Sequence, residues 1–343
     1  MVYHLITTNE KEEWTKYVTN SLIYDFYHTW YYHSLDKSGK PCLFVYEEGD
    51  IYIALPFLQR AINESISFDL TSVYGYAGPI SNIDFGEMTE GLKENFKKAF
   101  NKFLLMEQNI CVFSRLHPFI NQQVLLKEIG GIYANGKTVA IDLTIPLEAQ
   151  RAKYRKSTSE GIRRLRRKGY YVKEAESVDD IKTFVEIYAE NMKRIGALDY
   201  YLFDEQYFIN LLKAEEFRSK LVLVYLGDKA ICGSVYTSTN SIVEGHLIAT
   251  LTDHIKESPA KLLIDEISLI GRKSNMKYFH LGGGVGGSED SLFNWKAGFS
   301  DLFLDFKTWR YVANEDAYNL LVEQRVTELE PAADFFPLYR KMA

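Results

Sequence analysis

Two stretches half a chain apart decide the expected fold: LFVYEEGDIYIALP at Leu43–Pro56 and LVYLGDKAICGSVY at Leu223–Tyr236. Each consists of an apolar run, a short acidic turn that contains Gly-Asp, and a second apolar run. Apolar runs joined by such a turn predict a β-hairpin. The recurrence of one hairpin in each half of the chain indicates an internal duplication.

The segments around the two hairpins repeat in the same order. Two amphipathic helices are predicted before each hairpin, and a strand, a helix and a further strand are predicted after it. In the first half these segments are residues 9–21, 26–35, 67–76, 85–107 and 109–118, and in the second half 178–194, 204–217, 241–250, 259–274 and 276–284. The order predicts a mixed α/β chain of two similar domains, joined near residues 145–148.

Length and composition set the broad class of the protein. The 343 residues exceed one ordinary domain, and the 46% apolar and 25% charged residues are typical of a globular protein rather than a disordered, collagenous or disulfide-bonded one. No stretch approaches the roughly 18 apolar residues of a membrane span, and the first residues do not read as a secretory signal. We therefore expect a cytoplasmic location with reduced cysteines at positions 42, 111 and 232, and the net charge of −6 argues against a nucleic-acid-gripping surface.

Three strings give the chain a family resemblance. They are FDLTSVYGYAGPISN at Phe68–Asn82, YAENMKRIGALDYY at Tyr188–Tyr201 and HLGGGVGGSEDSLFNWKAGFS at His280–Ser300. The strings resemble segments of FemAB-like proteins from polysaccharide gene clusters, and the order of elements resembles two copies of the GNAT acyltransferase fold. Trp295 stands where relatives usually have Phe, and the chain has no room for the charged coiled-coil insertion of some peptidoglycan-bridge enzymes.

This resemblance to the tandem-GNAT, FemAB-like family implies an architecture. We expect an α/β fold with mixed sheets and two GNAT-like domains in tandem. The first would span residues 1–147, and a C-terminal helix within residues 312–343 would pack on it. The second, residues 148–311, would carry the acyl-donor site.

Glu244 and His246 are the candidate general bases. They stand two residues apart on a predicted strand, so their side chains point to the same face. The resemblance places this strand beside the donor thioester, where a carboxylate or imidazole can accept a proton from an attacking amine. A half-buried histidine with a purely structural role is the alternative.

The glycine-rich segment after residue 280 carries a second group of candidates. Five glycines in eight positions allow a ligand to approach the backbone closely, and neither a Walker motif nor a dinucleotide motif is present. Lys296 is suited to neutralise a diphosphate or an oxyanion, and Trp295 to stack on a ring, with Asp290 beside them. A plain hinge with a surface lysine and a core tryptophan is the alternative.

The turn IKESPAKL at residues 255–262 is the expected coenzyme A site. In the resembled fold, backbone amides at this helix start bind the pyrophosphate of coenzyme A. Ser258 fits the N-cap and a proline follows it, although the usual glycine-rich pattern is missing. The expected donor-binding residues are Lys256, Ser258, Ala260, Lys261 and Leu262.

Further substrate contacts are expected in both halves. Residues 151–168 hold nine basic residues and one acid, which either form a solvated helix face or contact phosphates of coenzyme A, a nucleotide sugar or tRNA. The first half is expected to contribute residues at an interdomain cleft, where ligands commonly bind. The expected acceptor-binding residues are Tyr74, Tyr76, Arg115, His117, Arg194, Tyr200 and Tyr201, together with Asp290 and Trp295.

The resemblance implies an enzyme, an N-acyltransferase that moves an acyl group from acyl-CoA to the amino group of a nucleotide-linked amino sugar in surface polysaccharide synthesis. Acyl transfer to an amine needs a base, an oxyanion donor and alignment, but no metal. Two alternatives remain. One is an aminoacyl-tRNA-dependent, FemX-like peptidyltransferase that builds peptidoglycan bridges, for which tRNA would be the partner. The other is a binding module that has lost its chemistry. The sequence leaves the oligomeric state open.

Overall fold

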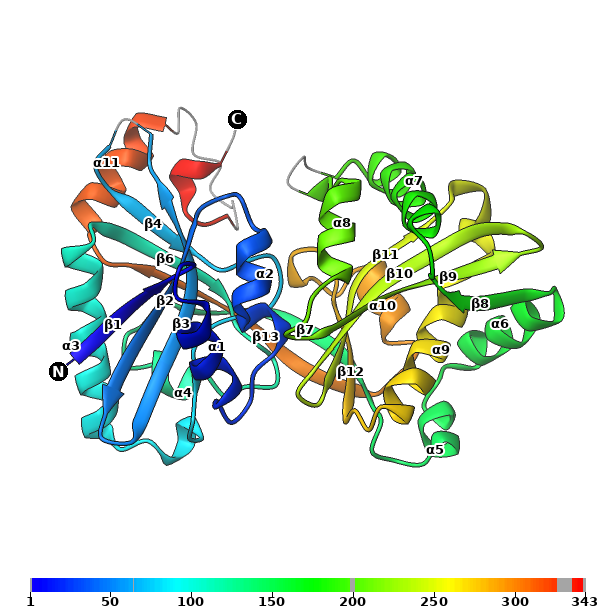
Figure 1. The fold of residues 1–343 in the computed structure, drawn as a ribbon, viewed down its shortest axis with the longest axis horizontal. Helices are drawn as coiled ribbons and strands as arrows, with labels where there is room; N and C mark the ends of the chain where they lie inside the picture. The colour runs from blue at the N-terminus through cyan, green and yellow to red at the C-terminus, as the bar shows by residue number, and fades with distance from the viewer. Residues whose placement is uncertain (1, 64, 198–200, 326–334, 342–343) are drawn as a thin grey trace. The chain divides into compact units, whose positions relative to one another are not determined.

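The computed structural model describes residues 2–63, 65–197, 201–325 and 335–341. The chain divides into two compact units, Met1–Asn135 with Asp305–Ala343, and Gly136–Leu304. Each unit is built around a mixed sheet that carries helices (Figure 1). Within the described ranges, no helix combines the length and the apolar character that crossing a lipid bilayer requires.

The first unit has a sheet in the order β1-β2-β3-β4-β6-β13, with the short β5 paired to β3. Its strands are β1 Val2–Thr7, β2 Lys40–Glu48, β3 Ile51–Ala61, β4 Phe68–Thr71, β5 Ile80–Ser81, β6 Asn109–Arg115 and β13 Leu302–Val312. Its α-helices are α1 Lys11–Thr19, α2 Trp30–Leu35, α3 Glu90–Met106, α4 Gln123–Leu126 and α11 Glu315–Arg325.

The second unit has a sheet in the order β8-β9-β10-β11-β12-β7. Its strands are β7 Ile132–Asp142, β8 Tyr170–Glu174, β9 Arg218–Leu226, β10 Lys229–Thr239, β11 Ile242–Thr250 and β12 Tyr278–Gly283. Its α-helices are α5 Leu147–Ala152, α6 Lys156–Arg167, α7 Val178–Ile195, α8 Glu205–Leu212, α9 Ala260–Lys273 and α10 Ser291–Lys296, and the 3₁₀ segment Thr252–Glu257 precedes α9.

The two sheets repeat one pattern of pairing. In each, four successive antiparallel strands (β1 to β4, β8 to β11) are followed by one parallel pair, β4 with β6 and β11 with β12. A last antiparallel strand completes each sheet, β13 beside β6 and β7 beside β12. The expected duplication of a mixed α/β domain is therefore confirmed, and the parallel strand pair occupies the same place in both described sheets.

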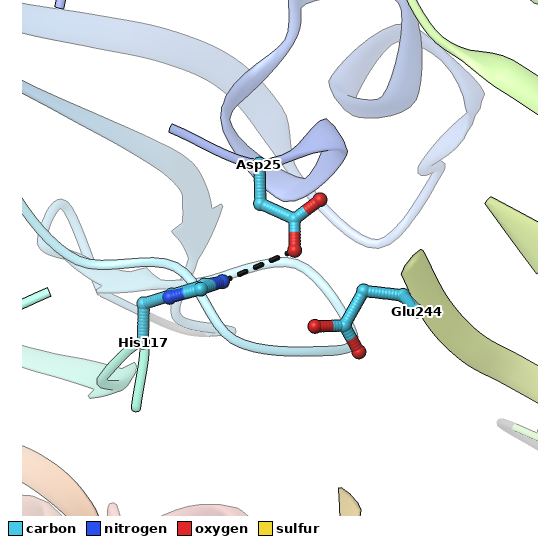
Figure 2. A group of neighbouring side chains, drawn as sticks. All are labelled: Asp25, His117 and Glu244. Atoms are coloured by element: carbon cyan, nitrogen blue, oxygen red, sulfur yellow. Dashed lines mark hydrogen bonds and ion pairs between the residues drawn. The ribbon is translucent and has the colours of Figure 1, made fainter. Parts of the chain in front are cut away.

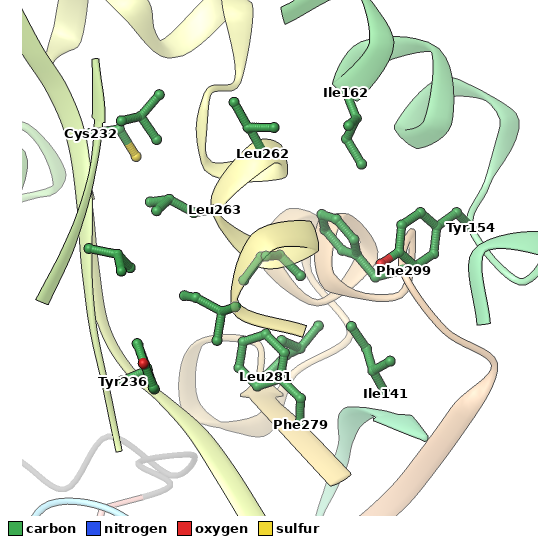
Figure 3. Close-up of a cluster of buried hydrophobic side chains, with 14 of the residues drawn as sticks. Ile141, Tyr154, Ile162, Cys232, Tyr236, Leu262, Leu263, Phe279, Leu281 and Phe299 are labelled. Carbon is green, nitrogen blue, oxygen red and sulfur yellow. The ribbon is translucent and has the colours of Figure 1, made fainter. Parts of the chain in front are cut away.

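Alternating side chains give each sheet two apolar faces. In the second unit, Val243 and Phe279 point to the face covered by α9, where they pack with Leu263 in the main core (Figure 3). Neighbouring positions point to the opposite face, where Phe184 of α7 lies against Gly233. In consequence Glu244, next to Val243 in sequence, belongs to the α7 and α8 face.

The first unit shows the same two-sided packing. Phe100 of α3 contacts the ring of Phe44 on β2, with ring centroids 5.2 Å apart. Trp14 of α1 joins Leu43 and Val45 in a cluster on the other face of that strand. Consecutive residues of one strand thus serve two helical layers, as the apolar run in the sequence requires.

The strand expected at residues 67–76 is shorter than predicted. β4 ends at Thr71, and the chain then turns through Gly75, whose φ of 129° is a conformation that L side chains rarely adopt. A Cβ there would lie 1.9 Å from the ring of Tyr27. The helix expected from residue 85 begins with a 3₁₀ turn, and α3 proper starts at Glu90 after the N-cap Thr89.

The basic segment at residues 151–168 forms α5, α6 and their junction, and part of its charge is used internally. Arg151 makes a bidentate contact with Asp265 of α9, at 3.1 and 2.8 Å, and Arg166 donates to the same carboxylate at 2.8 Å. Asp265 is buried, with 1% of its surface exposed. These contacts fix α5 and α6 against α9, so the segment has a structural role in addition to any contact with phosphate.

We expect Asp265→Ala to destabilise the chain by about 1–3 kcal/mol, because it leaves two arginines without their carboxylate; the figure is below that for a fully buried pair since both arginines are partly exposed. The measurement is the urea midpoint of unfolding. Glu266→Ala is the matched control, because it removes an ion pair of the same Arg166 at the surface and should cost under about 1 kcal/mol. Equal losses for the two variants would contradict a structural role for Asp265.

Candidate active site

The parallel pair β11 and β12 separates part-way along its length. In the described part of the chain, their pairing covers Ile242–Glu244 on β11 and Tyr278–His280 on β12 and stops there. β11 continues to Thr250, whereas β12 continues beside β7. Residues 245–250 therefore present one backbone edge that a ligand with amide groups can bind as an extra strand does.

A β-bulge distorts β11 directly after this point. Val235 of β10 is opposite Leu247, and Tyr236 is opposite Gly245, so His246 is the additional residue. Bulges bend a strand and re-aim its side chains, and they are common near active sites. The pairing with β12 ends at Glu244 and the bulge is at His246, so both irregularities of the sheet lie within two residues.

Glu244 lies where the two strands part. Both its carboxylate oxygens are 2.9 Å from Nδ1 of His280, its register partner on β12. The two residues are buried, with exposures of 2% and 0%. An ionised carboxylate only accepts hydrogen bonds, so Nδ1 of His280 donates to it. This partnership is the feature that sequence reasoning missed: His280 was noted only as the start of the glycine-rich string.

His246, the other predicted base, has a different environment. Its Nε2 lies 3.2 Å from the hydroxyl of Tyr207 on α8. Burial lowers the pKa of His246 to about 3. A base with so low a pKa is neutral at physiological pH and accepts a proton from an amine poorly. Of the two predicted bases, the geometry and the charge therefore favour Glu244.

Asp290, Trp295 and Lys296 are all fixed at α10. The carboxylate of Asp290 caps this helix, accepting from the amides of Phe293 at 2.9 Å and Val285 at 3.0 Å, and these bonds lower its pKa. Trp295 Nε1 donates to Ser258 Oγ at 3.2 Å. A Cβ on Gly284 would lie 2.1 Å from the carbonyl oxygen of Ser288, so this turn of the loop requires glycine.

Lys296 donates to the carbonyl oxygen of Gly283 at 2.6 Å. Burial lowers its pKa to about 8, an effect that the charges of Asp290 and Glu244 partly oppose. The Lys296 ammonium thus lies close enough to Glu244 for the carboxylate charge to stabilise it, and it is held at Gly283, the last residue of β12.

The start of α9 carries the predicted donor residues. Ser258 has a left-handed backbone with φ 55°, and no side chain of the described residues caps the helix. The amides of Lys261 and Leu262 donate to the carbonyls of Ser258 and Pro259, so these two amides are not available to an anion. Charged side chains must therefore supply much of the attraction for an anion bound there. Burial and the charge of Arg164 lower the pKa of Lys261. Ala260 begins the helix and Lys256 is exposed in the preceding 3₁₀ segment.

The corresponding places in the first unit are closed. The start of α3 has the side-chain cap Thr89, which accepts from the amide of Leu92, and an acid, Glu90, in its first turn. Beyond β4, backbone bonds from Ser72 to Phe113 and from Ala77 to Arg115, both N–H to O, keep the chain joined to β6. Among the residues that the structure describes, the combination of separated strands with a cationic helix start thus occurs in the second unit alone.

Three predicted residues of the first unit are used in its own packing. The hydroxyl of Tyr32 donates to the Tyr74 carbonyl at 2.9 Å, Tyr76 makes an edge contact with the ring of Phe306, and the guanidinium of Arg115 lies 5.6 Å from the ring centroid of Phe113.

His117 has both ring nitrogens engaged. Nδ1 accepts from the amide of Phe119 at 3.3 Å, which requires Nε2 to carry the hydrogen that it donates to Asp25 at 3.1 Å. Figure 2 shows this buried Asp25–His117 pair, and it also labels Glu244 on β11 of the second unit. The pair holds Asp25 in place, a role that the sequence did not reveal because the residues are 92 positions apart.

The segment near residue 200 is placed in part. Arg194 of α7 donates to the carbonyl of Thr250 at 2.9 Å, which holds the end of β11. The hydroxyl of Tyr188 donates to the carbonyl of Tyr201 at 2.7 Å. Tyr200 lies outside the described residues.

Comparisons with known proteins bear on the fold and on the second unit. Residues 152–296 match the family model described as an acetyltransferase (GNAT) domain. No curated protein matches the chain. Among solved structures, FemX is 12% identical, with 93% of this chain and 99% of that chain covered and a TM-score of 0.71.

Two further solved structures show the same fold. The C-terminal domain of a putative lysylphosphatidylglycerol synthetase from Agrobacterium fabrum is 16% identical, covering 91% of this chain and 96% of that one, with a TM-score of 0.56. L-PGS from Bacillus licheniformis is 12% identical, covering 89% and 92%, with a TM-score of 0.58. The domain match over residues 152–296 makes the chain an acyltransferase. More particularly, the expected architecture of two GNAT-like domains in tandem is confirmed.

We expect Lys296 to lose its proton near pH 8 rather than near the ordinary value of about 10.4, because burial disfavours its charged form. Selective ¹³Cε labelling of lysine, with the resonance assigned by its absence in Lys296→Met, gives the titration directly by NMR. A Lys296 resonance that titrates near the ordinary lysine value of about 10.4 would contradict the assignment of a buried ammonium.

Proposed function

We propose that the chain is an N-acyltransferase that moves an acyl group from acyl-CoA to the amino group of a nucleotide-linked amino sugar in surface polysaccharide synthesis. The observation that carries this proposal is the separation of β11 from β12 directly beyond the buried Glu244–His280 pair. It provides an open backbone edge for a donor, and a proton acceptor at its inner end.

The donor site uses two parts of the second unit. The edge of residues 245–250 would bind the amide-containing arm of coenzyme A, and the start of α9 would bind its pyrophosphate. A helix N-terminus attracts anions, and Lys261 adds a positive charge there. The bond from Trp295 to Ser258 links this turn to α10, so the donor site and the glycine-rich segment form one supported structure.

The chemistry assigns one task to each charged residue. Glu244 accepts a proton from the acceptor's ammonium group, and the free amine attacks the thioester carbonyl carbon. The second amine proton passes to the departing thiolate, so the products are an amide and a thiol. The cation of Lys296 would stabilise either the acceptor's diphosphate or the oxyanion of the tetrahedral intermediate, and we favour the diphosphate.

The acceptor class rests on the sequence strings. The segment FDLTSVYGYAGPISN at Phe68–Asn82 resembles those of FemAB-like proteins from polysaccharide clusters.

An aminoacyl-tRNA donor is the second candidate function. The fold similarity to FemX favours it, because that structure covers 93% of this chain. The basic α6 could then contact tRNA, but Arg166 and Lys168 already pair with Asp265 and Glu257. Part of the charge that tRNA would need is thus already committed within the unit.

We expect acetyl-CoA or a longer acyl-CoA to bind the chain in a calorimetric titration, and Lys261→Met to weaken that binding about tenfold through the loss of one charge-assisted phosphate contact. Lys102→Met on α3 is the matched control and should leave the dissociation constant unchanged. Tight binding of charged tRNA without any heat from acyl-CoA would exchange the order of the two candidate functions.

Replacement of the base should separate Glu244 from His246. We expect Glu244→Gln to lower kcat by ~10²–10⁴-fold, because the amide cannot take the amine proton. His246→Gln should retain kcat within about threefold, since a buried imidazole with a pKa of about 3 is not the acceptor. Steady-state rates with both substrates varied give the result, and a larger loss in His246→Gln than in Glu244→Gln would reverse the assignment.

A further inference from the structure

A row of polar side chains crosses the second sheet on its α7 and α8 face. Ser219 of β9 is the register partner of Thr237 on β10, Thr237 is the partner of Glu244 on β11, and Glu244 is the partner of His280 on β12. Register partners in adjacent strands point to the same side. The four side chains therefore lie side by side in a line perpendicular to the strands.

The outer part of this row is buried without hydrogen bonds. Ser219 is 5% exposed and Thr237 is 0% exposed. Their hydroxyl oxygens form no hydrogen bond with any residue in the described part of the chain. A buried hydroxyl without a partner costs free energy, and valine or alanine would fill the same positions without that cost. Thr239 has an unpartnered hydroxyl too, so what singles out Ser219 and Thr237 is their place in one row with Glu244.

The spacing of the row suits proton transfer. Directly opposed residues in a sheet have Cβ atoms about 4.5–5.5 Å apart, which places hydroxyl groups within reach of one bridging water. Hydroxyl groups both donate and accept, so each can pass a proton on while receiving another. The row thus offers a path away from Glu244 through Thr237 to Ser219.

The row ends at a surface hollow. Ser219 lines a cavity of about 250 Å³ together with residues of the α7 start, of α8 and of β9. Among the lining residues is Glu176, which is exposed to solvent. A proton that reaches Ser219 therefore arrives beside a hollow that an exposed carboxylate lines and can leave to that carboxylate.

We propose that Thr237 and Ser219 form a proton relay that returns Glu244 to its ionised state after each turnover. The proposal rests on the proposed function, in which Glu244 takes one proton from the acceptor's ammonium group. That proton leaves the carboxyl group for the oxygen of Thr237 through a bridging water, while the hydroxyl hydrogen of Thr237 moves on toward Ser219. One proton is released to solvent at the hollow, every hydroxyl is restored, and no bond other than O–H bonds breaks.

Thr237 and Ser219 are positioning residues for proton transfer, because neither contacts the reacting atoms. We expect Thr237→Val and Ser219→Ala each to lower kcat about tenfold with little change in KM, and to raise the solvent deuterium isotope effect on kcat as proton removal becomes limiting. Thr237→Ser should restore both values. Added imidazole should partly rescue Thr237→Val, which a purely structural defect would not permit.

Thr239→Val is the matched control. Thr239 is on the same strand and the same face and its hydroxyl is likewise without a partner in the described ranges, but its register partner is Ile242 rather than Glu244. It should keep the wild-type rate and isotope effect. Thr237→Val should also unfold at the same or a higher urea concentration than the wild type, since it removes an unsatisfied hydroxyl.

The outcomes separate the relay from the proposed function. If Glu244→Gln is inactive and Thr237→Val keeps the wild-type rate, isotope effect and pH profile, the relay is refuted and the base assignment stands. If Thr239→Val loses as much activity as Thr237→Val, the loss is structural and the relay is again refuted. Failure of the wild-type chain to transfer an acyl group from acyl-CoA to any amine would refute the proposed function and the relay together.

Discussion

The separation of β11 from β12 beyond Glu244 is the constraint on which the second unit depends. Two parallel strands that stop pairing leave backbone groups without partners, so the surrounding structure must hold them apart. β7 holds β12 in place by pairing with it, and Arg194 holds the end of β11 in place by donating to the carbonyl of Thr250. Because the opening is built into the sheet rather than into a loop, a donor bound there would meet a pre-formed site.

The two units show how one fold becomes specialised after duplication. Both keep the same pairing pattern and the same helical layers, since these form the apolar core. The two units differ at positions outside the apolar core. In the first unit the start of α3 has a cap and an acid, and backbone bonds such as that from Ser72 to Phe113 close the space beyond β4. In the first unit, backbone bonds and a side-chain cap thus occupy the places that correspond to the separated strands and the uncapped helix start of the second unit.

Local sequence patterns predicted much of the fold and only part of the site. The hairpins and the helices before them follow from apolar periodicity and Gly-Asp turns, which act over a few residues. β7 and β13 were missed because their place is decided by pairing with strands far away in the sequence. The strand position of Glu244 predicts which face it points to, but its partner His280 is 36 residues away and is set by a parallel register that no local signal encodes. The cap that Asp290 provides for α10 likewise does not follow from its neighbours in the sequence.

Buried polar residues in the described part of the chain differ in how completely they are hydrogen-bonded. Asp69 accepts from Arg60 and Tyr339, each at 2.7 Å, and Asp265 accepts from two arginines. The hydroxyl of Thr237, beside the Glu244–His280 pair, has no hydrogen-bond partner among the described residues, and that of Thr239 on the same strand has none either. A missing hydrogen bond alone therefore does not mark a chemical role. What distinguishes Thr237 from Thr239 is its register position directly opposite Glu244, and a proton from that carboxyl group can reach only a hydroxyl that lies beside it.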